Sequence, residues 1–179
     1  MLKSRLCIAF FAFAVGCAPA QKPLTDYVNP MLGTATLWDS VDLGFKPTKR
    51  TWGAEVFPGS SLPNAMVQVS PVTKFHSGAG YQYEDSVIYG FTHTNKGHWN
   101  LCHIPLLPVT GTPTPGDYCS PFSHERESAA PGYYQVFLDR YGVDAQLSST
   151  LRCAFHKYTY PAGAAASLLA DLQRSNEHV

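Results

Sequence analysis

A cluster of polar side chains lies between two apolar stretches of the segment YGFTHTNKGHWNLCHIPLLP, residues 89–108. The cluster contains three histidines, a lysine, a tryptophan, an asparagine and a cysteine: His93, Lys96, His98, Trp99, Asn100, Cys102 and His103. Such side chains could hold a metal ion, form a nucleophilic Cys–His pair or bind a polar ligand. They could also be satisfied residues of a folded core.

The histidine spacing argues against a metal site. His93, His98 and His103 are five residues apart, which fits neither the HExxH motif nor two ligands on one helix face. Calcium would prefer oxygen ligands. We therefore assign no metal ligand to this segment.

A nucleophilic pair is disfavoured by the geometry of a strand. Cys102 and His103 are adjacent, so on a strand their side chains point to opposite faces and cannot easily pair. Cys102 fits better as a small core hydrophobe.

A carbohydrate site fits the segment best. Such sites combine an aromatic ring, which covers the apolar face of a pyranose, with polar groups for its hydroxyls. Trp99 supplies the ring, and Gly97 lets the backbone bend. We predict that the loop faces a sugar through Lys96, Gly97, His98, Trp99 and Asn100. The alternative is that Trp99 packs in the core and His93 is a satisfied core histidine.

The elements that position this loop are predicted to be strands. Tyr133–Leu138, Val143–Ser148 and Arg152–Tyr160 form a meander with a turn at 139–142. Further strands are expected at Ala65–Val69, within GYQYEDSVIYGFTHT and HIPLLPVTG, and in the tail ASLLADLQ, where a helix is the alternative. The expected fold class is all-β, an antiparallel sandwich of the supersandwich type.

Composition narrows the function classes. Only 15% of the 179 residues are charged and 13% are aromatic, so the chain can bury a core and is not a disordered segment. A net charge of zero does not indicate the basic surface that binds the phosphates of a nucleic acid. Outside the amino-terminal region three cysteines remain, so at most one disulfide can form within the chain.

The first residues read as an export signal. Lys3 and Arg5 precede an apolar run from Leu6 to Val15 that is too short to span a bilayer. The sequence AVGC, which ends at Cys17, resembles the lipobox of bacterial lipoproteins; the alternative is an ordinary signal peptide. We predict a signal peptide over 1–17 with Cys17 lipidated, a tether over 18–26 and a domain over 27–179. The protein is then a periplasmic or outer-membrane lipoprotein, bound to the membrane only by its lipid.

Several blocks of the chain resemble the amino-terminal domain of glycoside hydrolase family 92. They are YVNPMLGT, FPGSSLPNAMVQVSP, GYQYEDSVIYGFTHT, PLLPVTG and FSHERESAAPGYYQVFLDRYGVDAQLSSTLRCAFHKYTYP, in that order. The family consists of bacterial exo-acting α-mannosidases that trim N-glycans and mannans, depend on calcium and invert the anomeric configuration. Trp52 and His76 are further candidates for sugar binding, because they lie on turns that resemble the family's substrate-facing loops. His93 is also a candidate.

The resemblance also implies where the chemistry resides. The catalytic acid, the catalytic base and the calcium ligands of the family belong to a carboxy-terminal helical barrel, so we expect no catalytic residue and no metal in this chain. Glu125 and Glu127 are expected in a solvated loop. The expected partners are mannose-containing glycans and the barrel domain. We expect an incomplete chain that is inactive alone; the alternatives are a stand-alone carbohydrate-binding module and a gene remnant.

Overall fold

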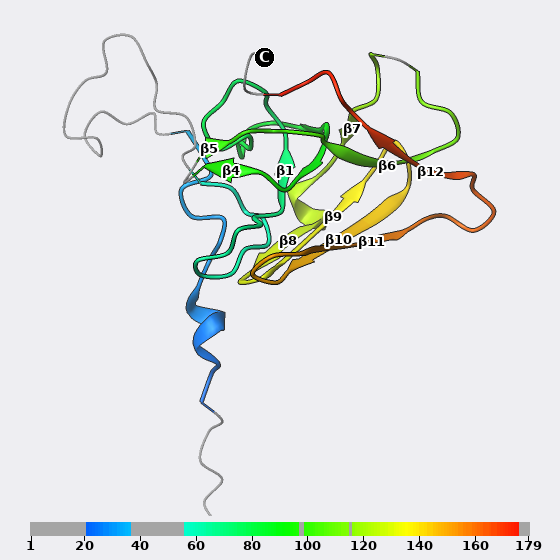
Figure 1. The fold of residues 1–179 in the computed structure, drawn as a ribbon. Helices are drawn as coiled ribbons and strands as arrows, with labels where there is room; N and C mark the ends of the chain where they lie inside the picture. Colours follow the sequence, from blue (N-terminus) through cyan, green and yellow to red (C-terminus); the bar gives the residue numbers. More distant parts are fainter. Residues whose placement is uncertain (1–20, 37–55, 97–98, 115, 176–179) are drawn as a thin grey trace, which may run out of the picture.

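The computed structural model describes residues 21–36, 56–96, 99–114 and 116–175, and every structural statement below concerns these residues. Two four-stranded antiparallel sheets lie one above the other (Figure 1). The first sheet has the order β1 (Ser70–Val72), β3 (Gly90–Thr92), β6 (Leu106–Thr110) and β12 (Ala166–Ala170). The second has the order β11 (Ala154–Thr159), β10 (Val143–Ser149), β9 (Tyr133–Leu138) and β8 (Glu127–Ala130).

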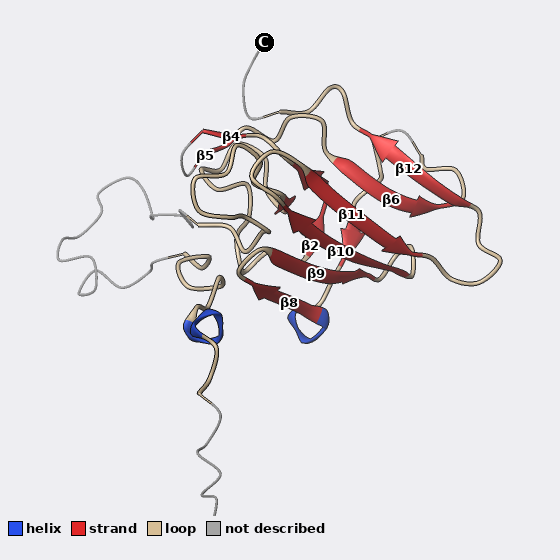
Figure 2. Cartoon of the chain, turned by 60° about the horizontal axis from the view of Figure 1, so that its bottom comes forward, coloured by secondary structure: helices blue, strands red, loops and turns tan. Residues whose placement is uncertain are grey.

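Two short strand pairs extend this arrangement. They are β2 (Val87–Ile88) with β7 (Ser120–Pro121), and β4 (Asn95–Lys96) with β5 (Trp99–Asn100). The described residues contain no α-helix, only the 3₁₀ turns η1 (Leu24–Tyr27) and η2 (His124–Arg126) (Figure 2). None of the described helical turns is long and apolar enough to cross a membrane. The all-β sandwich predicted from the sequence is confirmed.

The meander of the second sheet follows from alternation along its strands. Every second residue of β9 is buried, and β10 continues the pattern with Val143, Ala145 and Leu147. Antiparallel pairing then brings inward-facing residues opposite each other, as in Ala145 and Val136. The three strands and the intervening turn predicted here are confirmed, with ends that differ by no more than two residues.

The first sheet is predicted less well. The strand expected at HIPLLPVTG is β6, and ASLLADLQ contains a strand, β12, rather than a helix. The strand expected at Ala65–Val69 is wrong, because β1 begins only at Ser70. A turn at Asn64, whose φ is +59°, takes this segment out of the sheet, and the Met66 N–H donates to the carbonyl oxygen of Leu151 instead.

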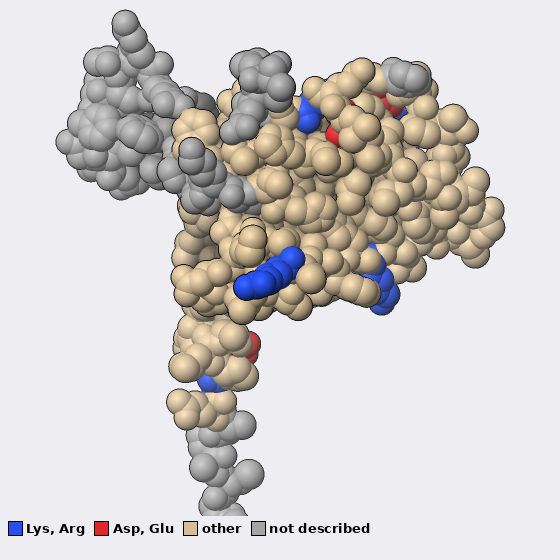
Figure 3. All heavy atoms as spheres, in the orientation of Figure 1, with Lys and Arg blue, Asp and Glu red and all other residues tan. Residues whose placement is uncertain are grey.

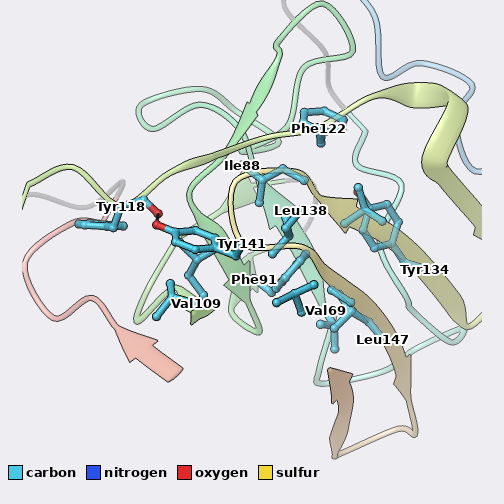
Figure 4. Packing of buried hydrophobic residues seen from close by; sticks show 14 of the residues in the cluster. Val69, Ile88, Phe91, Val109, Tyr118, Phe122, Tyr134, Leu138, Tyr141 and Leu147 are labelled. Carbon is cyan, nitrogen blue, oxygen red and sulfur yellow. Dashed lines mark hydrogen bonds between the residues drawn. The ribbon is translucent and has the colours of Figure 1, made fainter. Parts of the chain in front are cut away.

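The core lies between the two sheets (Figure 4). Phe91 of β3 is fully buried, and its ring centroid lies 6.5 Å from that of Tyr134 on β9. Val69, Leu107, Leu138 and Leu147 are also fully buried in this cluster. The three described cysteines, Cys102, Cys119 and Cys153, are all free thiols.

Candidate functional site

A groove with a volume of about 1060 Å³ runs past the end of the first sheet. Three chain segments that are far apart in the sequence form its walls: residues 73–76, residues 103–104 and residues 172–175. Its described lining consists of Thr73, Lys74, Phe75, His76, Tyr89, Thr94, His103, Ile104, Leu172, Gln173, Arg174 and Ser175.

The first wall is a closed loop that follows β1. The backbone N–H of Thr73 donates to the carbonyl oxygen of Gly80 at 2.8 Å, which joins the two ends of the loop. The Thr73 hydroxyl donates to Asp85 at 2.8 Å and accepts from the backbone N–H of Gln82 at 2.9 Å. Lys74 and Phe75 are thereby held on a rigid support.

Asn100 holds the second wall in place. Its side chain is fully buried, and its Oδ1 accepts from the Thr92 hydroxyl at 3.0 Å and from the backbone N–H of Cys102 at 2.8 Å. Its Nδ2 lies 2.7 Å from the Ser70 hydroxyl. Gly80 has φ +72°, and a Cβ there would lie 2.6 Å from Nδ2 of Asn100, so only glycine fits beside this amide.

The third wall is anchored by a buried carboxylate. Asp171 accepts from the Tyr118 hydroxyl and from the backbone N–H groups of Gln173 and Arg174, at 2.8 and 3.2 Å. The Arg174 guanidinium lies 4.8 Å from the centroid of the Tyr118 ring and 5.5 Å from that of Tyr89. Cation–π contacts of this kind keep the segment on the sheet.

The groove concentrates unusual backbone conformations. Four described residues other than glycine have positive φ, and two of them, His76 at +59° and Ile104 at +48°, line the groove. A third, Cys102 at +52°, belongs to the same loop as Ile104. Such conformations cost free energy and cluster at binding sites.

The lining of the groove combines aromatic surface with hydrogen-bonding groups, as binding of a hydroxylated ligand requires. Phe75 and Tyr89 provide aromatic surface, with ring centroids 5.4 Å apart, and His76, His103 and Lys74 provide polar groups. None of the described lining residues is an aspartate or a glutamate. The described residues also contain no group of three or more His, Cys, Asp and Glu side chains that could hold a metal ion. Few charged side chains occur on the face shown in Figure 3.

The structure separates the residues predicted to bind sugar. His76 lines the groove. Trp99 is 52% exposed on β5 but is not among the described lining residues, and Asn100 is buried beneath the second wall. Lys96 is placed only by its backbone in β4. Cys17, Trp52, Gly97 and His98 lie outside the described residues. Sugar binding by these residues stays a prediction.

His93 lies in a second polar cluster, at the junction of the two sheets. Its Nε2 is 2.7 Å from Nε2 of His156 on β11, and Nδ1 of His156 is 2.6 Å from the Tyr158 hydroxyl. Burial lowers the pKa of His93, and burial together with the neighbouring His93 lowers the pKa of His156 to about 4. Burial therefore favours the neutral form of both rings, and a hydrogen bond between two imidazoles requires at least one neutral ring as the acceptor.

Glu127 is not the solvated carboxylate that the sequence suggested. Its side chain is only 1% exposed and accepts from the hydroxyls of Tyr134, at 2.6 Å, and Tyr81, at 3.1 Å. Nδ1 of His124 lies 2.6 Å from its other oxygen. Burial, followed by the charge of Glu127, raises the pKa of both tyrosines well above the usual range. The expectation failed because alternation along β8 turns this side chain inward.

Sequence reasoning missed most of the groove. It named His76 but not Phe75, Tyr89, Ile104 or Arg174, because their proximity depends on contacts between distant segments. Only one signal could have pointed to Ile104. It directly follows the polar cluster.

Comparison with known proteins places this chain in a family. Residues 27–179 match the family model described as "Glycosyl hydrolase family 92 N-terminal domain". No curated protein matches the chain.

Solved structures extend the comparison. The chain is 32% identical to the GH92 α-mannosidase BT3965 from Bacteroides thetaiotaomicron, solved with mannoimidazole, with a TM-score of 0.71 over 86% of this chain and 20% of that one. It is 29% identical to the GH92 glycosyl hydrolase ccman5, with a TM-score of 0.65 over 85% and 21%. The inverting mannosidase BT2199 from B. thetaiotaomicron is 26% identical, with a TM-score of 0.65 over 84% and 20%. The chain thus spans about a fifth of the length of these relatives.

Proposed function

Because this chain belongs to glycosyl hydrolase family 92, as the match over residues 27–179 shows, we propose that it is a substrate-binding part of an exo-acting α-mannosidase. In this proposal the groove between residues 73–76, 103–104 and 172–175 contacts a terminal mannose of a glycan. The observation that supports this proposal most directly is that these three segments form one groove in a family 92 fold. Two of the segments contain a residue with a strained backbone conformation, His76 and Ile104.

The groove residues would act by binding and orienting the sugar. The rings of Phe75 and Tyr89 would contact the apolar C–H groups of the pyranose. His76, His103 and Lys74 would hydrogen-bond its hydroxyls. Because these contacts exclude water from one face of the sugar, they would hold the glycosidic bond in a fixed orientation.

Hydrolysis also needs catalytic carboxyl groups, and we assign none of them to the described residues. An inverting glycosidase uses two carboxyl groups roughly 6.5–9.5 Å apart, one as acid and one as base for the attacking water. Glu127, although carboxylate-bearing, is sealed beneath two tyrosines and cannot meet a substrate. We propose that both carboxyl groups come from the helical barrel domain that the family resemblance implies.

The proposal also covers the location of the calcium ion. Calcium takes six to eight oxygen ligands, with carboxylates prominent among them. The described residues contain no group of three or more His, Cys, Asp and Glu side chains that could hold a metal ion. From the family resemblance we propose that calcium, which would support the reaction in the intact enzyme, is held by the barrel domain.

The natural substrates in this proposal are N-glycans or mannans outside the cytoplasm. The motif before Cys17 supports export and lipidation. Growth with a labelled fatty acid tests this point: the unaltered protein is expected to incorporate label, and Cys17→Ser is expected to abolish it. Equal labelling of both proteins would contradict lipidation.

A binding experiment tests the sugar-contacting role. Titration calorimetry of the 179-residue protein with methyl α-mannoside is expected to show saturable binding that His76→Ala weakens. Lys157→Ala, which alters an exposed residue of β11 outside the groove, is the control and is expected to leave the affinity unchanged. An absence of binding, or an equal loss in both variants, would contradict the proposal. The same protein is expected to leave mannobiose intact with calcium present.

A further inference from the structure

The backbone conformation of Ile104 is unfavourable for three reasons. Its φ is +48°, in the left-handed region that favours glycine, asparagine and aspartate. Its side chain is β-branched, which makes this region still less favourable. It also precedes Pro105, whose ring restricts the preceding residue to extended conformations.

Core packing does not account for this conformation. The Ile104 side chain is 52% exposed and does not belong to the buried core cluster of the described residues. It lines the groove instead. If this position required only a soluble residue or a tight turn, glycine or asparagine would fit better. Asn64 is an example, with a φ of +59°.

The neighbouring residues hold Ile104 in place from both sides. On one side, the backbone N–H of Cys102 donates to the buried Oδ1 of Asn100 at 2.8 Å. On the other side, Pro105 is buried, and its carbonyl oxygen accepts from the backbone N–H of Asp171 at 3.0 Å. Asp171 is itself fixed by the Tyr118 hydroxyl. The strain therefore persists because two buried polar anchors flank it.

We infer that Ile104 is a specificity-determining residue of the groove, held in a strained conformation so that its aliphatic side chain contacts the C–H face of a hexopyranose. This inference rests on the proposed sugar-binding function. Phe75 and Tyr89, on the same groove, complete the apolar surface. A ring presents such a face, whereas an open-chain polyol with the same hydroxyls does not. Ile104 thus selects a cyclic sugar.

The test measures stability and affinity on the same variants, with methyl α-mannoside and mannitol as probes. Ile104→Asn relieves the backbone strain and is expected to raise Tm by about 2–4 °C. Ile104→Gly relieves the same strain but is expected to raise Tm by less, because glycine also adds freedom to the unfolded chain. Each also removes the aliphatic contact, so the affinity for methyl α-mannoside is expected to fall roughly fivefold, with mannitol binding unchanged. Ile104→Val keeps the strain and the apolar contact and is expected to match the unaltered protein in both measurements.

Leu151→Gly is the matched control. Leu151 is 53% exposed, lies outside the groove and does not have positive φ. Its replacement is expected to leave affinity unchanged and to leave Tm equal or lower, because glycine adds freedom to the unfolded chain.

The outcomes separate this inference from the function on which it rests. If the unaltered protein binds methyl α-mannoside and Ile104→Gly and Ile104→Asn bind it equally well, the inference is overturned and the proposed function stands. If affinity falls in these variants without any rise in Tm, the strain argument is overturned. If the unaltered protein binds no methyl α-mannoside, the proposed function fails, and the inference fails with it.

Discussion

The meander β8–β11 and the groove are built in opposite ways. The meander consists of neighbouring strands joined by short turns, and its inward-facing side chains, such as Val136 and Leu147, are fully buried. The groove brings together residues 73–76, 103–104 and 172–175 and contains two non-glycine residues with positive φ. The meander is therefore expected to carry stability, whereas the groove gives up stability to hold side chains at the surface.

The largest loss of stability is expected from a substitution in the meander. Leu147→Ala leaves a cavity among fully buried side chains and is expected to lower the free energy of unfolding by about 2–5 kcal/mol. Urea unfolding measures it. Leu151→Ala, at an exposed position, is the control and is expected to stay within about 0.5 kcal/mol. Equal losses in the two variants would show that the meander core is not what stabilises the fold.

The second substitution tests Glu127, the buried carboxylate at the start of β8. Glu127→Gln replaces one carboxylate oxygen with an NH2 group and removes the negative charge, so the hydrogen bonds from Tyr81 and Tyr134 lose a charged acceptor. Loss of a charge-assisted hydrogen bond at a buried site is expected to cost about 1–3 kcal/mol. Glu125→Gln, an exposed neighbour, is expected to change little. If Glu127→Gln unfolds at the same urea concentration as the unaltered protein, Glu127 is not the buried acceptor described here.

Acid is expected to weaken the junction between the sheets. The pKa of His156 is lowered to about 4 by burial and by His93, whereas an unfolded histidine titrates near 6.5. Between these two pH values the unfolded chain binds more protons than the folded protein. The free energy of unfolding therefore falls as the pH decreases from about 6.5 to 4. Above about pH 6.5 this histidine no longer changes it. After allowance for solvent screening the loss is about 1 kcal/mol.

Urea midpoints at pH 7 and pH 5 measure this loss. His156→Gln removes the titrating group, so its midpoint is expected to shift less between the two pH values than that of the unaltered protein. An equal shift in both proteins would assign the acid sensitivity to other groups.

The smallest stability effect is expected at the edge of the polar cluster. Trp99 is 52% exposed, so Trp99→Ala leaves little cavity and is expected to cost about 1 kcal/mol or less. If Trp99 stacks on a mannose ring, the same change lowers affinity for methyl α-mannoside by roughly tenfold. A large fall in Tm with unchanged affinity would assign Trp99 to the structure instead of the site.

The two regions also differ in how far the sequence predicts them. Alternation and turn residues are local signals, and they predict the strand Tyr133–Leu138, which is β9. The loop around Asn100 was predicted as sugar-facing from its residue types, yet the Asn100 side chain is buried by bonds to Ser70 and Thr92. Neither the positive φ of Ile104 nor the approach of Arg174 to Tyr89 can be read from neighbours in the chain.

The central claim, that the groove binds a mannoside while the meander serves only the fold, is tested most directly by an NMR titration. Methyl α-mannoside is added to the ¹⁵N-labelled 179-residue protein, and backbone amide shifts are followed residue by residue. The account predicts saturable shifts at His76, His103, Ile104 and Gln173, with the amides of β9 and β10 unmoved. Shifts confined to the meander, or no saturable shift at the groove residues, would contradict it.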